Sequence, residues 1–527
     1  MATFAVCASD ARGKVCLAVT TRRCDVQSSS RTSTARPWLA SSRPLLFIAA
    51  GSLFCRRRLR RSARACRAAP GACGGQRPVG ELLAWLASLG ARGLDGLRLA
   101  PSLHPGRGLG VFATRDFQPG STFCEVPAEG ILVATPGITA SLPAAASAEA
   151  ALAAALLRER ALGRTSRFAP YVASLPRGGE LATGHPLFWP DGLRAEDLLA
   201  GSAHGRRVAA EVLGRCREDI AALVASGVAD NEEEARWALA VVDSRAFTFQ
   251  PDRPNEQLAL VPLLDMLNTF SLLQDDEALW QCTFTSEGTA AQGAALSVER
   301  EICKGDEVLH LYSSNSSAMQ WMVYGFLEDG PGDNPFETAG FMLNAESEVR
   351  GEDKDLASAK LSLLSEAGLR PDRLLFELPG DSEIGGPLLP VARVLSCSCL
   401  EEVKRVAPAL EGIDDPEHHP RNSGLELELR ARRRIASWLR GALRKCDETG
   451  LSSQAGTSAA AAATPEAMLH KLATMLYSRE RPVLELELHT NERFTSGAEV
   501  ALAGGGAARS AFELQHWDDE TGWLGAG

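Results

Sequence analysis

The order of strand-like and helix-like segments constrains the fold of this chain more than any other feature of its sequence. Short apolar runs typical of strands occur between residues 111 and 127, and they return in "LALVPLLDMLNTF" and "GAALSVEREICKGDEVLHLY", which end at residues 270 and 312. Residues 144–249 lie between these runs and have the texture of helices, beginning with the Ala-rich "AAASAEAALAAALLRER". A helical block inserted between strands predicts an α+β fold.

Turn and cap residues refine this outline. Gln118-Pro119-Gly120 is a turn signal that predicts a β-hairpin from the first two strands, ending at Pro127. Asn231, followed by three acidic residues, predicts the start of a helix. Beyond Asn334-Pro335 the chain has the pattern of a separate helical domain. In "LELELRARRRIASWLRGALRKC" five apolar residues can share one helix face: Leu425, Leu429, Ile435, Leu439 and Leu443.

Charge is divided unevenly along the 527 residues. Residues 1–78 hold fifteen Arg and Lys and only two acidic residues, a net charge of +13. Because the whole chain carries −11, residues 79–527 carry −24. So acidic a body is a poor binder of polyanions, which argues against nucleic acid as a partner and favours basic protein surfaces. A hydrophobic content of 45% with 23% charged residues is typical of a soluble globular protein.

The basic first 78 residues resemble an organelle transit peptide, with a plastid favoured over a mitochondrion and the cytoplasm as the remaining alternative. A disordered basic tail is the alternative interpretation of the segment itself. The apolar run between Arg43 and Arg56 is shorter than the ~20 residues that a membrane-spanning helix needs, so no stable membrane insertion is expected.

The cysteines predict neither disulfides nor a metal site. Six of the thirteen fall within residues 1–78 and the other seven are scattered. Cys397 and Cys399 are the nearest approach to a metal signature, but their spacing is tight and no second pair accompanies them.

Two short motifs could contact a ligand through backbone and polar groups. Gly106, Gly108 and Gly110 in "GRGLG" allow close approach of the main chain, although a simple tight turn would use the same residues. A dinucleotide fingerprint is excluded because Val111 stands where the third glycine is needed and a strand follows. Asp265 and Asn268, three positions apart, would face one way on a helical turn, although both residues commonly cap turns.

Two of the only four tyrosines in the chain, Tyr312 and Tyr324, lie in the short segment "HLYSSNSSAMQWMVYGF". A tyrosine ring tolerates an ammonium group against its face, and its hydroxyl can orient an amine. The pair could therefore line an amine-binding channel, or both could be core aromatics.

In order, the segments "GRGLGVFATRDFQPGSTFCEVP", "PYVASLPRG", "WALAVVDSRAF", "LVPLLDMLN", "ICKGDEVLHLY" and "YGFLEDGPGDNP" resemble the SET-domain protein methyltransferases. The resemblance is to the subclass of the Rubisco large-subunit lysine methyltransferase and its actin-histidine relative. It covers residues 80–340, and "MLYSRERPVLE" extends it more faintly into the C-terminal helices.

The resemblance implies a domain organisation. A SET β-fold core over residues 79–335 carries the helical insertion at about 140–249. An all-α substrate-binding domain follows over 336–500, and residues 501–527 form a flexible tail.

It also implies an S-adenosylmethionine-dependent protein-lysine N-methyltransferase that acts on a non-histone protein as a monomer. Tyr312 would be the catalytic tyrosine, and Tyr324 and Phe326 would line the substrate channel. Arg245 would lie near the amino-acid end of the cofactor, where the alternative is a surface salt bridge. The further cofactor-binding positions implied are Arg107, Gly108, Leu109, Asp265, Asn268 and Thr269.

Three residues depart from the family's pattern. Thr269 replaces a histidine, Ser313 a glycine and Ser317 an asparagine. The extra Cβ at position 313 matters most, because glycine permits close approach or unusual dihedral angles. Two alternatives therefore stay open: protein-histidine methylation on the same scaffold, and a catalytically silent module that binds a protein partner.

Overall fold

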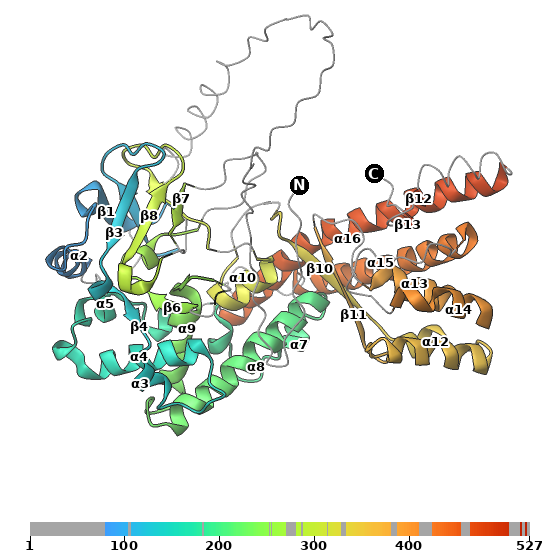
Figure 1. The fold of residues 1–527 in the computed structure, drawn as a ribbon, viewed down its shortest axis with the longest axis horizontal. Coiled ribbons are helices and arrows are strands. Elements are labelled where there is room, and N and C mark those ends of the chain that lie inside the picture. The colour runs from blue at the N-terminus through green and yellow to red at the C-terminus, as the bar shows by residue number, and fades with distance from the viewer. Residues whose placement is uncertain are drawn as a thin grey trace, which may run out of the picture.

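The computed structural model describes residues 79–103, 107–181, 184–251, 253, 256–269, 281–285, 288–312, 315–327, 334–380, 387–410, 424–454, 464–504, 517–518 and 522–523. The basic segment predicted over residues 1–78 lies outside this part of the chain, as does Ser313. Within the described ranges, no helix is both long and apolar enough to cross a membrane. Figure 1 shows a strand-rich body at one end of the molecule and a bundle of helices at the other.

The strand-rich body contains three antiparallel sheets of three strands each. Their orders are β1-β2-β9, β3-β8-β7 and β4-β6-β5. The strands are β1 (Leu97–Pro101), β2 (Leu109–Ala113), β3 (Thr122–Val126), β4 (Leu132–Val133), β5 (Ala246–Phe249), β6 (Gln257–Leu260), β7 (Cys282–Phe284), β8 (Ala294–Val298) and β9 (Glu307–Val308).

The predicted hairpin of the first two strands is wrong. β2 pairs with β1 and β9, whereas β3 pairs with β8. The turn itself is present, because Ser121 N donates to Gln118 O over 3.1 Å and Gly120 has φ +80°. The turn transfers the chain from one sheet to another, since Phe117 pairs with Ile302 through two backbone hydrogen bonds and Gly120 N donates to Val298 O.

The helices between β4 and β5 agree with the expected insertion. They are α3 (Pro136–Thr139), α4 (Ala148–Leu162), α5 (Ala169–Ser174), α6 (Gly178–Leu181), α7 (Ala195–Leu198), α8 (Ala203–Ala225) and α9 (Glu232–Arg245). The Asn231 side chain accepts a hydrogen bond from Glu234 N, which confirms the predicted helix start. The Ala-rich α4 is buried along residues 150–157 because small side chains let neighbouring helices approach it closely.

The C-terminal part is mainly helical, but it is not the all-α unit that was expected. β10 (Thr338–Leu343) and β11 (Leu374–Pro379) form an antiparallel pair. Over its first five residues β11 alternates buried and half-buried side chains, with the period of two that is typical of a strand. The strand is short and is flanked by helical sequence, so it was not identified from the sequence. The helices here are α11 (Ala345–Glu348), α12 (Lys354–Glu366), α13 (Leu388–Ser396), α14 (Leu400–Val406), α15 (Leu425–Gln454) and α16 (Pro465–Ala503).

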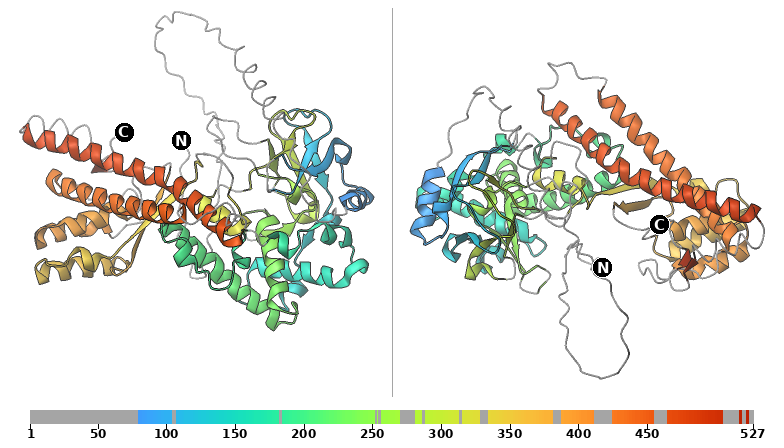
Figure 2. Two further views of the ribbon diagram at one scale, coloured as in Figure 1. Left: turned by 180° about the vertical axis from the view of Figure 1, so that it is seen from behind. Right: turned by 90° about the horizontal axis from the view of Figure 1, so that it is seen from above.

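Helices α15 and α16 run side by side, as Figures 1 and 2 show. All five apolar residues predicted to share a face of α15 are buried. Helix α16 joins two hydrophobic cores, because Leu472 and Leu476 pack into the core of the strand-rich body while Val483 and Leu484 pack into the core around α13 and α15.

The segment predicted as a flexible tail begins within a helix, since α16 continues to Ala503. Further on, the two-residue strands β12 (Trp517–Asp518) and β13 (Gly522–Trp523) pair with each other. Helix α2 (Val79–Ser88) covers the other end of the described chain and buries Leu82 and Leu86.

Candidate active site

Tyr312 lies shortly after β9, and its hydroxyl donates a hydrogen bond to Leu267 O over 2.8 Å. Burial of the hydroxyl raises the pKa of Tyr312 above its ordinary value, and the neighbouring Tyr324 contributes in the same direction. The phenol is therefore protonated across the physiological pH range. A neutral hydroxyl held by one carbonyl can orient an amine, but it cannot act as a strong base.

Three aromatic rings meet at this point. The ring centroids of Tyr312 and Tyr324 are 4.9 Å apart, and Phe326 lies 6.5 Å from Tyr312 and 6.4 Å from Tyr324. The Arg107 guanidinium lies 5.8 Å from the Phe326 ring centroid. The aromatic residues predicted to line one channel are thus brought together, within the distances at which rings and cations interact favourably.

His310 also contacts Tyr312, and the centroids of the two rings are 5.2 Å apart. The imidazole ring of His310 stacks on the Phe247 ring, with centroids 5.7 Å apart. Burial lowers the pKa of His310 to about 4, so the imidazole is neutral at pH 7. Sequence reasoning passed over this residue, although it stands two positions before Tyr312 on the same segment.

Helix α10 (Ser317–Tyr324) carries Tyr324 as its last residue. Gly325 ends the helix in the left-handed conformation, with φ +78°, and a Cβ there would lie 2.9 Å from the His185 backbone. Only glycine fits both conditions, which explains the "YGF" sequence at this end of the helix.

Arg245, the last residue of α9, lies against Asp265. Its guanidinium donates to Asp265 O over 2.7 Å and lies 3.6 Å from the carboxylate, and the Tyr171 hydroxyl donates to the same carboxylate over 2.9 Å. Burial raises the pKa of Asp265, and the charge of Arg245 opposes this shift. Among the described residues, Arg245 Nε and Asp265 Oδ1 are buried without a hydrogen-bond partner. Each of these atoms can therefore still form a hydrogen bond with a bound group.

Asp265 lies in a short 3₁₀ turn, Leu264–Met266, entered through Leu263 at φ +78°. A positive φ at leucine is strained, and such strain is found where neighbouring structure must hold a side chain in place. The turn ends before Asn268, so the expectation that Asp265 and Asn268 face one way is wrong. Asp265 contacts Tyr171 and Arg245, whereas Asn268 points toward β2 and β9.

Asn268 joins the glycine segment to β9. Its amide donates to Leu109 O over 3.1 Å and to Glu307 Oε1 over 2.8 Å, and its backbone O accepts from His310 N over 3.1 Å. A Cβ on Gly110 would lie 2.1 Å from Glu307 Oε1. The glycine at position 110 is therefore required by close packing against Glu307.

Glu307 is a buried residue that sequence reasoning missed. Its other carboxyl oxygen accepts from Leu103 N over 2.8 Å and from Ser102 Oγ over 3.1 Å, so one side chain holds both the residues that precede the glycine segment and Asn268. An acidic residue inside the apolar stretch "DEVLHLY" was the available signal, because a buried carboxyl group needs several partners.

Arg107 and Thr269 also meet, because the Arg107 guanidinium donates to Thr269 O. Gly108 has φ +72°, and a Cβ there would contact nothing within 4 Å, so backbone conformation alone favours glycine. The charges of Arg245, Arg107 and Asp265 all act on the Tyr312 hydroxyl. Arg107, Arg245 and Asp265 therefore lie near Tyr312, although they come from distant parts of the sequence.

The described residues also bear on metal binding. Over the described ranges, no group of three or more His, Cys, Asp or Glu side chains could hold a metal ion, and the described cysteines are free thiols.

No protein-family model and no curated protein matches the sequence. Solved structures do match. A structure of Rubisco LSMT bound to sinefungin and monomethyllysine has a TM-score of 0.56 at 16% identity and covers 81% of this chain and 94% of its own. The LSMT SET domain bound to lysine and AdoHcy has a TM-score of 0.54 at 15% identity, with 80% and 92% covered. Rubisco LSMT bound to AdoMet has a TM-score of 0.54 at 16% identity, with 80% and 93% covered. The chain therefore has the fold of the SET-domain methyltransferase structures of Rubisco LSMT.

Proposed function

We propose that this protein is an S-adenosylmethionine-dependent methyltransferase that methylates a lysine side chain of a protein. The observation that carries the proposal is the position of Tyr312, which lies among Tyr324, Phe326 and His310 and beside Arg245. The similar Rubisco LSMT structures, which hold AdoMet or AdoHcy and lysine or methyllysine, support it.

The residues present fit the cofactor. Arg245 offers a guanidinium with an unpartnered Nε for a carboxylate, since arginine binds carboxylates through paired N–H groups. A Cβ on Gly108 would meet nothing within 4 Å, so there is space beside the main chain here, and in this proposal the peptide groups of Gly108 and Leu109 bind the amino group. In this proposal Asn268 contacts the adenosine or the amino group through its side-chain oxygen, because its amide nitrogen donates to Leu109 O and Glu307 Oε1. When bound, S-adenosylmethionine supplies a methyl group on a sulfonium, which an amine can displace in line.

In this proposal the aromatic rings favour the neutral form of the lysine amine that accepts the methyl group. A lysine amine has an ordinary pKa near 10.4 and must lose a proton before it can attack. Withdrawal from water among Tyr312, Tyr324 and Phe326 disfavours the ammonium form and lowers that pKa. The Tyr312 hydroxyl donates to Leu267 O, which leaves its oxygen lone pairs free to accept from an amine N–H.

Thr269 bears on whether the site is active. At this position the backbone carbonyl accepts from Arg107, and this contact does not depend on the side chain. The replacement of a histidine ring by threonine removes packing surface and leaves this backbone contact in place. We therefore favour an active enzyme over a silent binding module.

The finer parts of the proposal concern the acceptor and the compartment. We propose a non-histone protein with an accessible lysine as the substrate, a monomeric enzyme that does not bind nucleic acid, and a plastid location. The net charge of −24 on residues 79–527 supports a basic protein partner, and the composition of residues 1–78 supports import into an organelle.

The test uses the purified full chain with S-adenosylmethionine labelled in its methyl group and a cell extract as the source of acceptors. We expect one discrete protein band to become labelled, and acid hydrolysis of that band to release methyllysine. Tyr312→Phe should lower the labelling rate about 10²-fold, the usual effect of removing one hydrogen-bonding group from a catalytic site.

Tyr477→Phe is the matched control, because that hydroxyl also donates to a backbone carbonyl, Leu198 O, but lies outside the site. Its labelling rate should stay within about twofold of the parent, since it touches none of the proposed groups. Methylhistidine in the hydrolysate would replace lysine by histidine as acceptor. No labelling together with no heat of S-adenosylmethionine binding in calorimetry would favour the silent module.

A further inference from the structure

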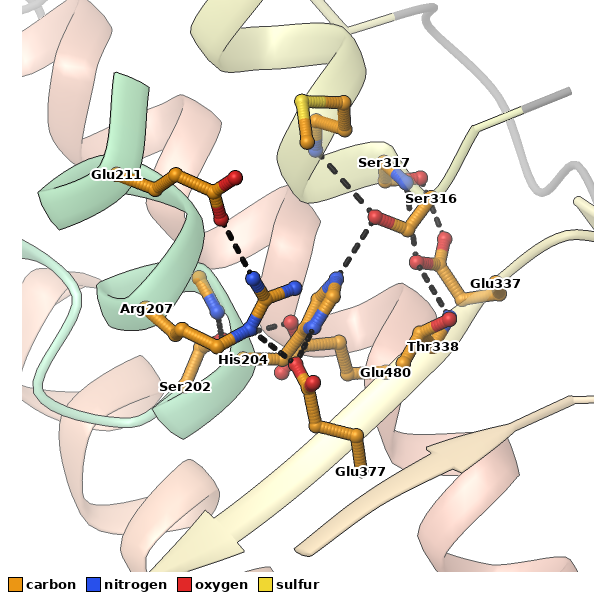
Figure 3. A network of polar contacts seen from close by, with 12 residues as sticks. Ser202, His204, Arg207, Glu211, Ser316, Ser317, Glu337, Thr338, Glu377 and Glu480 are labelled. Atoms are coloured by element: carbon orange, nitrogen blue, oxygen red, sulfur yellow. Dashed lines mark hydrogen bonds and ion pairs between the residues drawn. The ribbon is translucent and has the colours of Figure 1, made fainter. Parts of the chain in front are cut away.

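A partly buried polar network connects the active-site helix α10 with the C-terminal part of the chain. Figure 3 shows its members, which come from α8, the start of α10, the strands β10 and β11, and α16. None of these groups belongs to the site described above. Their position at the far end of α10 from Tyr324 raises the question of what they hold in place.

His204, in the first turn of α8, lies at the centre of the network. Its Nδ1 contacts Glu377 Oε1 on β11, and its Nε2 lies 2.8 Å from Ser316 Oγ. Burial alone would raise the pKa of Glu377, but hydrogen bonds from His204 and Arg207 lower it below its ordinary value. Glu377 is therefore an ionised acceptor, and His204 Nδ1 must carry the proton that it donates.

The second nitrogen of His204 then determines the role of Ser316. With Nδ1 as the donor to Glu377, Nε2 is the ring nitrogen that bonds Ser316, and we assign the Ser316 hydroxyl as the donor to it. The same Ser316 oxygen is the N-cap of α10, where it accepts from Met319 N over 3.4 Å. We call this chain of three side chains, Glu377, His204 and Ser316, the relay.

A second contact holds the same end of α10. Ser317 N, the first backbone donor of the helix, lies 3.1 Å from Glu337 Oε1, and Ser317 Oγ donates to Glu337 Oε2. Arg479 of α16 donates to Ser317 Oγ over 3.1 Å. Two of the orphan backbone donors at the start of α10 are thus satisfied, Ser317 N by Glu337 and Met319 N by Ser316.

An acid, a histidine and a serine in this order also occur in serine hydrolases, but the relay cannot act as a nucleophile. Ser316 is 7% exposed and His204 is 4% exposed, so a substrate carbonyl cannot reach the hydroxyl. The Ser316 oxygen is also occupied as a helix cap. The relay therefore has a structural role, and it can influence the candidate active site only by holding α10 in position.

Helix α10 is a short rigid body between the relay and the site. It has only eight residues, and Ala318, Trp321 and Met322 are buried where it packs against α8, α9 and α16. Its last residue, Tyr324, has its ring 4.9 Å from Tyr312. A shift or fraying of the first turn is transmitted along two turns of helix to this pair of rings.

We propose that His204 is a positioning residue, which holds α10 through Ser316 and thereby places Tyr324 against Tyr312. The inference rests on the proposed function, because it assigns β11 and α8 a part in the methylation site. A misplacement of about 1 Å can cost on the order of 10²-fold in rate, so loss of the His204 to Ser316 bond should lower methyl transfer roughly ten- to hundredfold.

Two substitutions of His204 separate its two hydrogen bonds. In His204→Asn the amide can take the place of Nδ1 and donate to Glu377, but nothing reaches Ser316. In His204→Gln the amide oxygen can take the place of Nε2 and accept from Ser316. We expect His204→Asn to lower the rate and His204→Gln to keep it within about threefold of the parent, a gap set by the cost of misplacement.

Two measurements on the full chain test whether His204 positions α10. Hydrogen exchange measured by mass spectrometry over residues 316–327 reports the stability of α10, and it needs neither substrate nor activity. The initial rate of labelling of the extract band at saturating S-adenosylmethionine reports the chemistry, and calorimetry reports cofactor affinity. His204→Asn should speed exchange in α10 and slow labelling while cofactor affinity stays unchanged.

Ser316→Ala breaks the same bond from the other side and serves if His204→Asn does not fold. Asp353→Ala is the matched control, because it removes the N-cap of α12, which is held by bonds to Asp355 N and Leu356 N and is separate from the relay. It should lower thermal stability without changing α10 exchange or the labelling rate.

Unchanged exchange in α10 for both His204→Asn and Ser316→Ala would overturn the relay. Equal losses of rate in His204→Asn, His204→Gln and Asp353→Ala would also overturn it, because they would reflect general destabilisation. If the parent chain labels no protein at all, the proposed function fails, and α10 exchange alone still decides whether the relay holds the helix.

Discussion

Gly110 is a position where the addition of one methyl group should have a large effect that can be calculated from the structure. A methyl group there would have its Cβ 2.1 Å from Glu307 Oε1, 2.8 Å from Glu307 Cδ and 3.1 Å from Asn268 Nδ2. Non-bonded carbon atoms at optimal contact lie about 3.5–4.0 Å apart, so Gly110→Ala must displace the Glu307 side chain.

The displacement breaks the contacts that Glu307 makes with Ser102, Leu103 and Asn268. At about 1 kcal/mol net for each hydrogen bond, the free energy of unfolding should fall by about 3 kcal/mol. Because Leu109 and Asn268 move with these contacts, S-adenosylmethionine affinity should fall too, and a loss of 1.4 kcal/mol in binding is a tenfold weaker Kd. Urea unfolding followed by tryptophan fluorescence and calorimetric titration measure the two quantities.

A double-mutant cycle with Glu307→Ala tests the cause. When the carboxyl group is absent, the added methyl group has room, and alanine is favoured over glycine in a strand by roughly 0.5–1 kcal/mol. Gly110→Ala should therefore cost almost nothing in that background, a coupling of about 3 kcal/mol. Gly108→Ala is the control: its cost of about 1–2 kcal/mol comes from φ +72° and should not depend on Glu307. Additive effects of Gly110→Ala and Glu307→Ala would refute the steric reasoning.

Two further predictions concern buried titratable side chains. Burial lowers the pKa of His310 from 6.5 to about 4, so the unfolded chain binds a proton that the folded chain excludes, and stability is lost as pH falls from about 6.5 toward 4. His310→Phe removes this penalty, and its stability relative to the parent should improve by about 2 kcal/mol between pH 7.5 and pH 5 in urea unfolding, whereas a difference independent of pH would contradict the assignment. In the C-terminal part, Glu428 accepts from Arg393 over 2.8 Å and from Arg432 over 3.0 Å, with all three side chains buried. Glu428→Gln should lower the free energy of unfolding by about 3–5 kcal/mol, and a loss below 1 kcal/mol would show that the charges are solvated.

Features that depend on residues close together in the chain were the easiest to predict. Tyr312, Tyr324 and Phe326 lie within fifteen residues of one another in the chain, and in the structure their rings lie within 6.5 Å. The helical insertion and the buried face of α15 were also predictable, because amphipathic spacing and cap residues act over a few residues.

Pairing across long separations could not be predicted in the same way. The turn at Gly120 is as expected, yet β2 and β3 enter different sheets, because Phe117 pairs with Ile302. Glu307 and Leu103 are 204 residues apart, and His204 and Glu377 are 173 apart. No local pattern relates such residues, and only the folded core brings them into contact.

The same distinction decides how much the departures from the methyltransferase pattern matter. At position 269 the contact present in the structure is made by the backbone carbonyl, which any residue provides. At position 317 the serine hydroxyl donates to Glu337 and accepts from Arg479, so it has its own role in holding α10. A side chain that departs from a motif is damaging when the motif used that side chain, and in this chain position 269 makes a backbone contact while Ser317 makes side-chain contacts of its own. The proposed methyl transfer should therefore depend more on Glu307 and His204, which lie outside the recognised motif residues, than on Thr269.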